Sequence, residues 1–331
     1  MQHLHSAWRV RARAWTTLVC AALLGWGAAQ AAGYPERPVQ FVIGFAAGGA
    51  TDINGRLIAK TMGEQLKQPF VVENKLGAAG SIGVAYVTAA RPDGYLIGMS
   101  GLGSTVIQPI LGKKLGYDPE NDLTPVAFLG SSSMAFITRP GSPIRSIEDL
   151  VRAAKDKPGQ LSYGTAGNGT PGHLAGAYLS SMAGIAITQI PYKGDAELLP
   201  DLMSGRLDFA VVGTVSVFSM LKTDKLHGIA LTSRDRLKTL PAVRTVGESG
   251  QPGYEAETWN LLIVPNGTPA EIGHKLNTTV NSITGDPAFQ DKLVELGSQT
   301  RSMPPEELKR FVKSEREKWT RVIRDGKITV D

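Results

Sequence analysis

The segment at residues 44–52, which reads Gly-Phe-Ala-Ala-Gly-Gly-Ala-Thr-Asp, constrains the fold of this chain strongly. An apolar run at residues 39–43 precedes it, which is typical of a buried strand. Apolar residues follow it at the spacing of one helix face, at Ile53, Leu57, Ile58, Met62 and Leu66. The segment is therefore predicted to be a tight turn that leads from a buried strand into a helix.

Such a turn is suited to hold a small anion. The first N–H groups of a helix have no partner within the helix, and its N-terminus carries about half a positive charge. Gly48 and Gly49 allow a sharp turn and place no side chain between these N–H groups and a guest. The alternative, in which the two glycines only shape the connection, remains open at this point.

The N-terminal residues have the pattern of a secretory signal. Arg9, Arg11 and Arg13 form a positive region, residues 15–26 are apolar, and residues 29–31 read Ala-Gln-Ala. The apolar run is too short to span a membrane, which argues against an uncleaved anchor. We therefore expect residues 1–31 to be a signal peptide and the mature chain to begin near Ala32 in the periplasm.

The composition of the mature chain excludes several classes of function. The only cysteine, Cys20, lies in the leader, so the mature protein has no disulfide, metal thiolate or thiol nucleophile. The leader arginines account for three of the five net positive charges, and a charge near +2 gives no electrostatic case for nucleic acid. Three histidines remain after the leader, too far apart in sequence for a metal pair. We predict neither a metal nor a cofactor.

A second glycine-rich loop, at residues 165–173, is built like the first. It follows an apolar run at residues 161–164, which is predicted to be a strand. Thr170 with Pro171 is a typical helix N-cap followed by proline at the first helical position. The loop therefore also joins a strand end to a helix start.

Strands and helices alternate along the rest of the chain, which predicts an α/β fold with parallel sheet layers and helices on both faces. Ligands of such sheets bind outside the carboxyl ends of the strands. The simplest arrangement places one glycine loop in each of two lobes, facing across a cleft. Predicted strands are 69–73, 95–99, 126–129, 135–138, 187–191, 209–212, 228–231 and 261–264, and a loop is predicted at 100–104. Predicted helices are 84–90, 146–154 and 196–204. Further helices are predicted to start at Thr268, which begins a capping box, at Asp286 and at Pro304. The last helix is predicted to pack on the first lobe.

Nine sequence markers resemble the periplasmic solute-binding receptors of tripartite tricarboxylate transporters, often called the Bug family. The resemblance covers nearly the whole mature chain, and the order and spacing of the markers make it specific. Three loop positions, Gly44, Ala47 and Leu76, depart from the family pattern, which usually has proline there, so we expect a more flexible first loop. The markers are Tyr-Pro-Glu-Arg-Pro at 34–38, Gly-Gly-Ala-Thr-Asp at 48–52, residues 73–80, 92–95, 163–170 with 173–175, 191–194, 201–208, Trp259 and 265–269.

The resemblance implies a two-lobed, type II periplasmic-binding-protein-like fold, in which each lobe is a mainly parallel sheet with flanking helices and the ligand lies in the interlobe cleft. It implies lobe 1 at residues 32–133 plus 256–331 and lobe 2 at 134–255. It also implies a small carboxylate ligand, held by backbone groups and ordered waters, and no catalytic residue. The implied ligand-binding residues are Phe45, Ala46, Ala47, Gly48, Gly49, Ala50, Thr51 and Asp52 in the first loop and Thr165, Ala166, Gly167, Gly169 and Thr170 in the second.

Several of these residues have a structural interpretation beside the functional one. Asp52 would repel a carboxylate that it touched, so capping backbone N–H groups or holding a bridging water suits it better. Thr170 serves as an N-cap, as a ligand contact, or as both. Packing is an equal alternative for Phe45 and the favoured one for His173. Ser104 and Tyr192, at other strand ends, are weaker candidates.

An enzyme and a sensor are the competing functions. The chain has no Gly-x-Ser-x-Gly turn and no His-Glu-x-x-His motif, which argues against an exported hydrolase. The glycines at 44, 48 and 49 do not form the dinucleotide-binding pattern. The resemblance implies a monomeric receptor that delivers its ligand to a membrane transporter. The alternative is a ligand-sensing protein that docks on a membrane sensor without uptake.

Overall fold

The computed structural model describes residues 33–328 except 46, 49, 193 and 327. The predicted signal peptide, residues 1–31, lies outside the described residues. Among the helices that are described, none combines the length and the apolar character that crossing a membrane requires.

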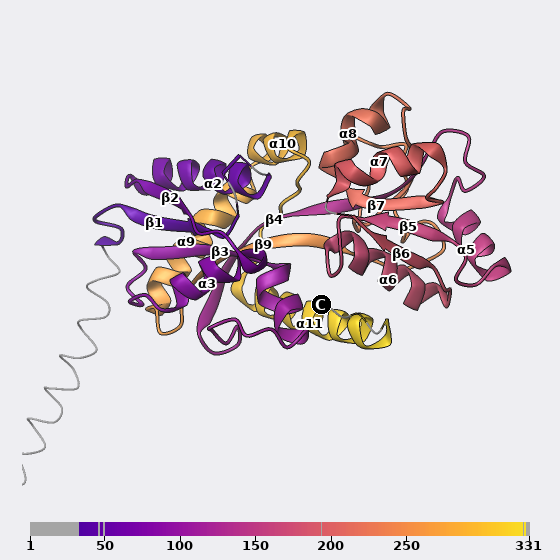
Figure 1. Cartoon of the computed structure of the whole chain (residues 1–331). Coiled ribbons are helices and arrows are strands. Elements are labelled where there is room, and N and C mark those ends of the chain that lie inside the picture. Colours follow the sequence, from indigo (N-terminus) through magenta and orange to yellow (C-terminus); the bar gives the residue numbers. More distant parts are fainter. Residues whose placement is uncertain (1–32, 46, 49, 193, 327, 329–331) are drawn as a thin grey trace, which may run out of the picture.

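The first sheet contains the strands that the N-terminal part of the chain forms. β1 pairs in parallel with β2 on one side and with β3 on the other, and β9 then joins β3 and β4 in antiparallel orientation. Helices α2, α3 and α9 flank this sheet (Figure 1). The elements are β1 (Val39–Ile43), α2 (Ala50–Leu66), β2 (Phe70–Asn74), α3 (Ser81–Thr88), β3 (Leu96–Gly101), β4 (Leu123–Thr138), β9 (Glu257–Pro265), α9 (Ala270–Thr284) and α10 (Pro287–Glu295).

The second sheet repeats this plan with residues from the middle of the chain. β5 pairs in parallel with β6 and β7, while β4 pairs in antiparallel orientation with β7 and β8. Both sheets are therefore mixed, and the parallel pairs are those that carry the glycine loops. The elements are α5 (Ile147–Asp156), β5 (Ser162–Thr165), α6 (Pro171–Ala183), β6 (Thr188–Pro191), α7 (Asp195–Ser204), β7 (Phe209–Gly213), α8 (Thr214–Lys222) and β8 (His227–Leu231).

A single long strand, β4, belongs to both sheets. Its first part pairs with β9 as far as the Ser133–Glu257 pair, and from Met134 onward it pairs with β7. The prediction of two separate strands at 126–129 and 135–138 is wrong. The polar residues between them interrupt the apolar pattern, but strand pairing is made by the backbone and continues through them. Figure 1 shows β4 and β9 running between the two groups of elements.

The predicted loop at residues 100–104 is also wrong. β3 continues to Gly101, and residues Gly103–Ile107 form a π-helical turn that leads into the short helix α4 (Gln108–Ile110). The Ser100 Oγ lies 2.6 Å from the Thr105 Oγ1 and 3.0 Å from the Ser104 Oγ. These hydroxyl contacts, which the sequence pattern does not reveal, satisfy buried polar groups in the turn.

The helix starts were predicted better than their caps. Ser146 and Asp286 accept hydrogen bonds from the backbone N–H groups of Asp149 and Ala288, as expected of N-caps. Thr170 and Thr268 precede α6 and α9, but neither accepts such a bond. Each hydroxyl instead donates to a carbonyl three residues earlier, so the predicted side-chain caps at these two positions, including the capping box at Thr268, are wrong.

The last helix, α11 (Pro305–Asp325), contacts elements of both sheets. It packs against β4, the π-helical turn and α6, so the prediction that it packs on the first lobe is incomplete. The buried Glu315 accepts hydrogen bonds from the indole N–H groups of Trp259 on β9 (2.8 Å) and Trp319 (3.0 Å). Trp319 also contacts the ring of Tyr178 on α6, at 6.0 Å between centroids.

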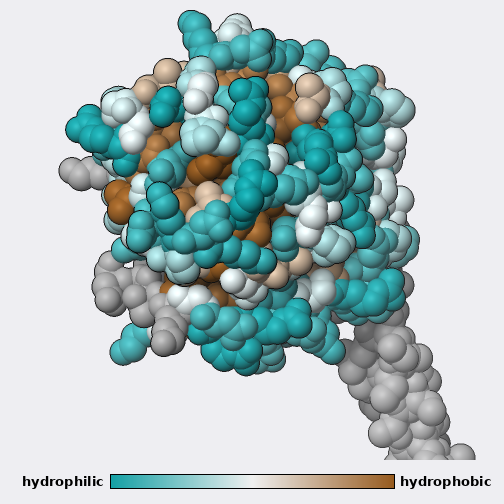
Figure 2. Space-filling view, turned by 90° about the vertical axis from the view of Figure 1, so that its right-hand side faces the viewer, coloured by the Kyte–Doolittle hydropathy of each residue, from teal (hydrophilic) through white to brown (hydrophobic). Residues whose placement is uncertain are grey.

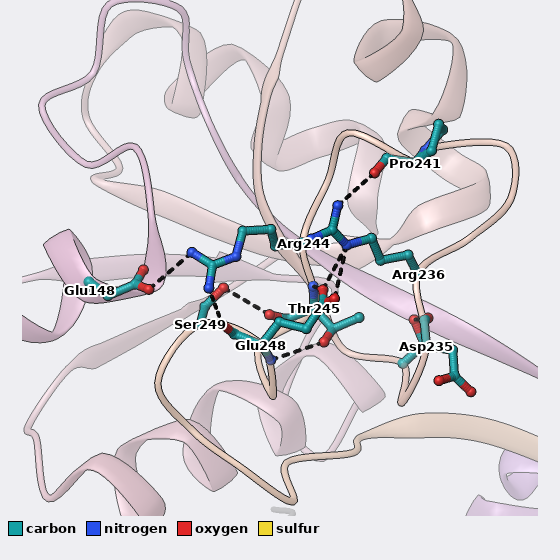
Figure 3. Close-up of polar contacts among 9 residues, drawn as sticks. Glu148, Asp235, Arg236, Pro241, Arg244, Thr245, Glu248 and Ser249 are labelled. Atoms are coloured by element: carbon teal, nitrogen blue, oxygen red, sulfur yellow. Dashed lines mark hydrogen bonds and ion pairs between the residues drawn. The ribbon is translucent and has the colours of Figure 1, made fainter.

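The irregular segment between β8 and β9 is held by polar contacts rather than by regular structure (Figure 3). Glu248 accepts from the Arg236 Nε–H at 2.8 Å and from the backbone N–H of Thr245 at 2.8 Å. Arg244 reaches out of the segment to Glu148 on α5, at 3.2 Å. The segment also pairs with β8 at one position, where the Leu231 N–H donates to the Arg244 carbonyl and the Val246 N–H donates to the Leu231 carbonyl, both at 2.9 Å.

On the face of the molecule that the second sheet and its helices form, apolar residues are exposed in several places, and polar residues lie between them (Figure 2). Two large apolar side chains of this part of the chain are more than two-fifths exposed, Met203 on α7 (45%) and Val215 on α8 (42%). Scattered apolar exposure is ordinary for a globular protein. Val215 differs from the scattered residues because it lines a cavity.

Candidate functional site

The segment at residues 44–52, called loop 1 from here on, is the predicted tight turn. β1 ends at Ile43 and α2 begins at Ala50. Gly48 has a backbone φ of +82°, which residues with a side chain rarely adopt. A Cβ atom on Gly44 would lie 2.6 Å from the Cα of Gly80, so loop 1 packs closely on Gly80, the residue just before α3.

Asp52 organises loop 1 from within. Its Oδ2 accepts hydrogen bonds from the Gly48 N–H (2.9 Å) and the Arg56 Nε–H (2.8 Å), and its Oδ1 accepts from the Asn74 Nδ2 (2.7 Å). Asn74 donates also to the carbonyl of Phe45, at 2.8 Å. Asp52 is 1% exposed. Its carboxylate therefore ties both ends of the loop together.

The surroundings of Asp52 favour its ionised form. Burial alone would raise the pKa of this carboxyl group. The hydrogen bonds from Arg56, Asn74 and the Gly48 N–H outweigh burial and lower the pKa to about 2. Asp52 is thus an anion at neutral pH whose charge is compensated by Arg56, which limits its repulsion of a ligand carboxylate.

Phe45 and Ser104 both lie near Gly80, the residue just before α3. A Cβ atom on Gly80 would lie 3.2 Å from the Phe45 ring and 3.9 Å from the Ser104 Oγ. Phe45 is partly buried, whereas Ser104 is 1% exposed and takes part in the hydroxyl cluster with Ser100. The structure thus brings Phe45 and Ser104 to the same edge of the first sheet.

The segment at residues 165–173, called loop 2 from here on, is closed by its own hydrogen bonds. The Thr165 hydroxyl accepts from the Gln189 Nε2 at 2.7 Å, and the Thr165 side chain is fully buried. The Thr170 hydroxyl donates to the Gly167 carbonyl at 2.7 Å. Ala166, Gly167, Gly169 and Thr170 are partly exposed. The outer groups of loop 2 therefore belong to residues 166–170, of which Asn168 is exposed and the others are partly exposed.

His173 bonds to loop 2 through its side chain and Tyr192 through its backbone, since the Tyr192 N–H donates to the Thr165 carbonyl at 2.9 Å. The His173 Nδ1 accepts from the Gly169 N–H at 3.0 Å, and burial lowers the pKa of this imidazole, which keeps it neutral as an acceptor. The Tyr192 hydroxyl donates to the Asp201 Oδ2 at 2.7 Å. Burial, together with this hydrogen bond to Asp201, raises the pKa of Tyr192 to about 12. Both side chains are bonded within the second-sheet part of the protein.

The predicted residues fall into two groups, one at each sheet. Phe45, Ala47, Gly48, Ala50, Thr51, Asp52 and Ser104 belong to the first sheet, and the other described candidates belong to the second. Both loops follow the carboxyl ends of parallel strands. Among the described residues, no hydrogen bond joins loop 1 to loop 2. Ala46 and Gly49 lie outside the described residues.

Sequence reasoning missed several residues that shape loop 1. Arg56 lies one helical turn after Asp52, and this spacing is the signal that could have identified it. Asn74 was used only as a family marker. Helix α8 was not predicted, although with loop 1 and α10 it encloses a cavity of about 510 Å³. In the described part of the chain, no cluster of three or more His, Cys, Asp or Glu side chains is arranged to hold a metal ion.

Comparisons with known proteins identify the family. The family model described as "Tripartite tricarboxylate transporter family receptor" matches residues 55–328. The protein BugT of Bordetella pertussis is 29% identical over 88% of this chain and 90% of its own length. The structure of R. palustris Rpa4515 with adipate is 33% identical with a TM-score of 0.74, covering 89% of this chain and 99% of that one. MatC of Rhodopseudomonas palustris with bound malate is 29% identical with a TM-score of 0.69, covering 88% and 100%. These matches confirm the α/β solute-binding-protein fold, and the chain belongs to the tripartite tricarboxylate transporter receptor family, which includes the Bug proteins.

Proposed function

We propose that the mature chain is a periplasmic solute-binding receptor that captures a small organic carboxylate between two lobes and delivers it to a membrane tricarboxylate-type transporter. The observation that carries this proposal is the pair of glycine loops, each joining a parallel strand to a helix start, one in the first sheet and one in the second. Helix starts of this kind favour anions. Two similar proteins, Rpa4515 and MatC, are known with adipate and malate, which are both carboxylates.

Pairing along β4 supports the proposed lobe boundaries. We assign residues 32–133 plus 256–331 to lobe 1 and residues 134–255 to lobe 2. β4 changes partner from β9 to β7 between Ser133 and Met134. β9, which pairs with the first part of β4, begins at Glu257. The chain crosses between the lobes within β4 and again just before β9, and two such connections are suited to act as a hinge.

We assign ligand contact to backbone groups of the two loops and a positioning role to the buried side chains. Asp52, Thr165, His173 and Tyr192 are all engaged in hydrogen bonds within the protein. A ligand carboxylate would then be bound by N–H groups near the start of α2 and by the outer groups of loop 2. Neither loop contributes a lysine or an arginine, so one carboxylate group is recognised by geometry and the rest of the ligand by pocket shape.

A thermal-shift screen of the mature, ligand-free protein tests this function. The screen compares small organic carboxylates with the neutral amide of each. A ligand present at 100 times its dissociation constant adds about 2.7 kcal/mol of stability. We expect at least one carboxylate to raise the melting temperature while its amide does not. A screen in which sugars or amides act and no carboxylate does would contradict the proposal.

A further inference from the structure

The cavity of about 510 Å³ beside loop 1 is lined by elements of both sheets. Gly48 of loop 1 and Ile53 and Asn54 of α2 form one side, residues of α8 form another, and the end of α10 forms the third. Gly48 belongs both to loop 1 and to the cavity lining. Loop 1 and the cavity are therefore adjacent.

The accessible walls of the cavity have an apolar part, formed by Ile53, Val215, Phe218 and Leu296, and a polar part, formed by Asn54, Ser216, Ser219 and Glu295. Ile53 is 41% exposed and Val215 is 42% exposed, and Phe218 and Leu296 also line the space. At the edge of the cavity α8 meets the turn after α10, because a Cβ atom on Gly297 would lie 2.4 Å from a methyl group of Val215. An apolar ligand body would cover Ile53 and Val215 and would contact parts of both lobes at once.

The charge of the cavity opposes a second carboxylate. Among its described lining residues, Glu295 is the only one that carries a charge, and no lysine or arginine is among them. A carboxylate group placed here would lose its hydration and would face another anion. A neutral group meets neither cost.

The cavity lining also contains one buried hydrogen-bonding atom without a protein partner. The Asn54 Nδ2 donates to the Ser298 Oγ at 2.7 Å, while the Asn54 Oδ1 is buried and unpaired among the described residues. Turning the amide by half a rotation would exchange the two atoms and leave the other one unpaired. A buried unpaired amide end is satisfied by a water or by a neutral polar group of a ligand.

We propose that this cavity is a specificity subsite that selects monocarboxylates with an apolar body over dicarboxylates of the same length. The proposal rests on the proposed function, since it assigns the carboxylate to loop 1. It separates this chain from Rpa4515 and MatC, whose ligands adipate and malate carry a carboxylate at both ends.

Calorimetry on the mature, ligand-free protein tests the proposal with matched probes. Butyrate, hexanoate, octanoate and 4-methylbenzoate are each compared with succinate, adipate, suberate and terephthalate, respectively, which have the same numbers of carbon atoms. We expect the affinity for the straight-chain monocarboxylates to rise by up to about fourfold per methylene group. We expect each dicarboxylate to bind at least tenfold more weakly than its partner. Dicarboxylates that bind as tightly as their partners would overturn the subsite and leave the proposed function standing. A panel in which no carboxylate binds would overturn both.

Two variants separate the subsite from general effects on the fold. Val215 lies in the first turn of α8, where an acidic residue is favoured by the helix dipole, so Val215→Asp should fold. We expect it to weaken octanoate binding at least tenfold. Val71→Asp is the matched control, because Val71 is 54% exposed on β2 and lies outside the cavity. Glu295→Gln should strengthen suberate binding severalfold and leave octanoate unchanged. Equal effects of Val215→Asp and Val71→Asp would contradict the subsite.

Discussion

Asp52 fixes the shape of loop 1, and replacing it with asparagine tests how much the loop depends on this carboxylate. Asp52 Oδ2 accepts two hydrogen bonds, from Gly48 and Arg56, and Oδ1 accepts one from Asn74. An asparagine offers one oxygen acceptor and one NH₂ donor in the same space. In Asp52→Asn the new NH₂ group therefore faces the N–H donors that one of the carboxylate oxygens bound, and Arg56 loses its charge partner.

The pKa of Asp52 gives the size of the expected effect. A carboxyl group with a pKa of about 2 in the folded state and about 3.9 in the unfolded state contributes about 2.6 kcal/mol at neutral pH. Arg56 is 46% exposed, and solvent weakens its attraction for the carboxylate. We therefore expect Asp52→Asn to lower the free energy of unfolding by about 1–2 kcal/mol at pH 7.

The sign of the pH dependence follows from the lowered pKa. The stabilisation by Asp52 is fully present above about pH 4, the ordinary pKa of the group, and is lost as the pH falls toward 2. Urea unfolding of the wild type and of Asp52→Asn at pH 7, 5 and 3 measures this difference. Asp291→Asn, on an aspartate whose side chain is 67% exposed, is the control. An Asp52→Asn difference that is absent at pH 7, or that stays constant down to pH 3, would refute the reasoning.

Three further predictions follow from single residues. Tyr192→Phe removes the hydrogen bond to Asp201 and should lower the free energy of unfolding by about 1 kcal/mol in urea titrations; an unchanged midpoint would show that the bond is not needed. Burial, then the nearby charge of Glu255, raises the pKa of Glu257 to about 7, so ionising this group costs stability as the pH rises from about 4.5 through 7. Glu257→Gln should therefore be more stable than the wild type by roughly 2 kcal/mol at pH 8 and close to it at pH 4, and equal differences at both pH values would contradict this. Gly48→Val has space for its side chain but strains a residue with φ of +82°. This variant should stay folded by circular dichroism and should bind the carboxylate at least tenfold more weakly in calorimetry. Wild-type affinity would show that Gly48 is not part of the site.

The periodic parts of the chain could be predicted from the sequence. The apolar run at β1 and the helix face of α2 gave the correct order of strand, turn and helix around loop 1. Proline and aspartate at helix starts located α6, α10 and α11 within a residue or two. These signals are local, so tertiary contacts are not needed to read them.

What could not be predicted depends on partners far away in the sequence. β4 runs through Gly130 and three serines because its backbone pairs with β9, which lies about 130 residues later. The hydroxyls of Thr170 and Thr268 bond to nearby carbonyls because the loop geometry, rather than helix propensity, decides their rotamers.

The candidate site divides in the same way. Gly48 could be predicted because a tight turn before a helix favours glycine. Arg56 could also have been identified, from its position one helical turn after Asp52. The role of Asn74 around Asp52 could not, since Asn74 approaches from β2. The cavity that α8 forms with loop 1 and α10 depends on three elements that are distant in sequence, so no local sequence motif predicts it.

Small-angle scattering of the mature protein, with and without a carboxylate that the thermal-shift screen identifies, tests the central claim most directly. The account predicts that the radius of gyration falls when the carboxylate saturates the protein, because contacts with both loops are gained only when the lobes approach. The neutral amide of the same compound should leave the radius unchanged. A bound carboxylate that leaves the radius of gyration unchanged, or an amide that compacts the protein equally, would contradict the capture of a carboxylate between two lobes.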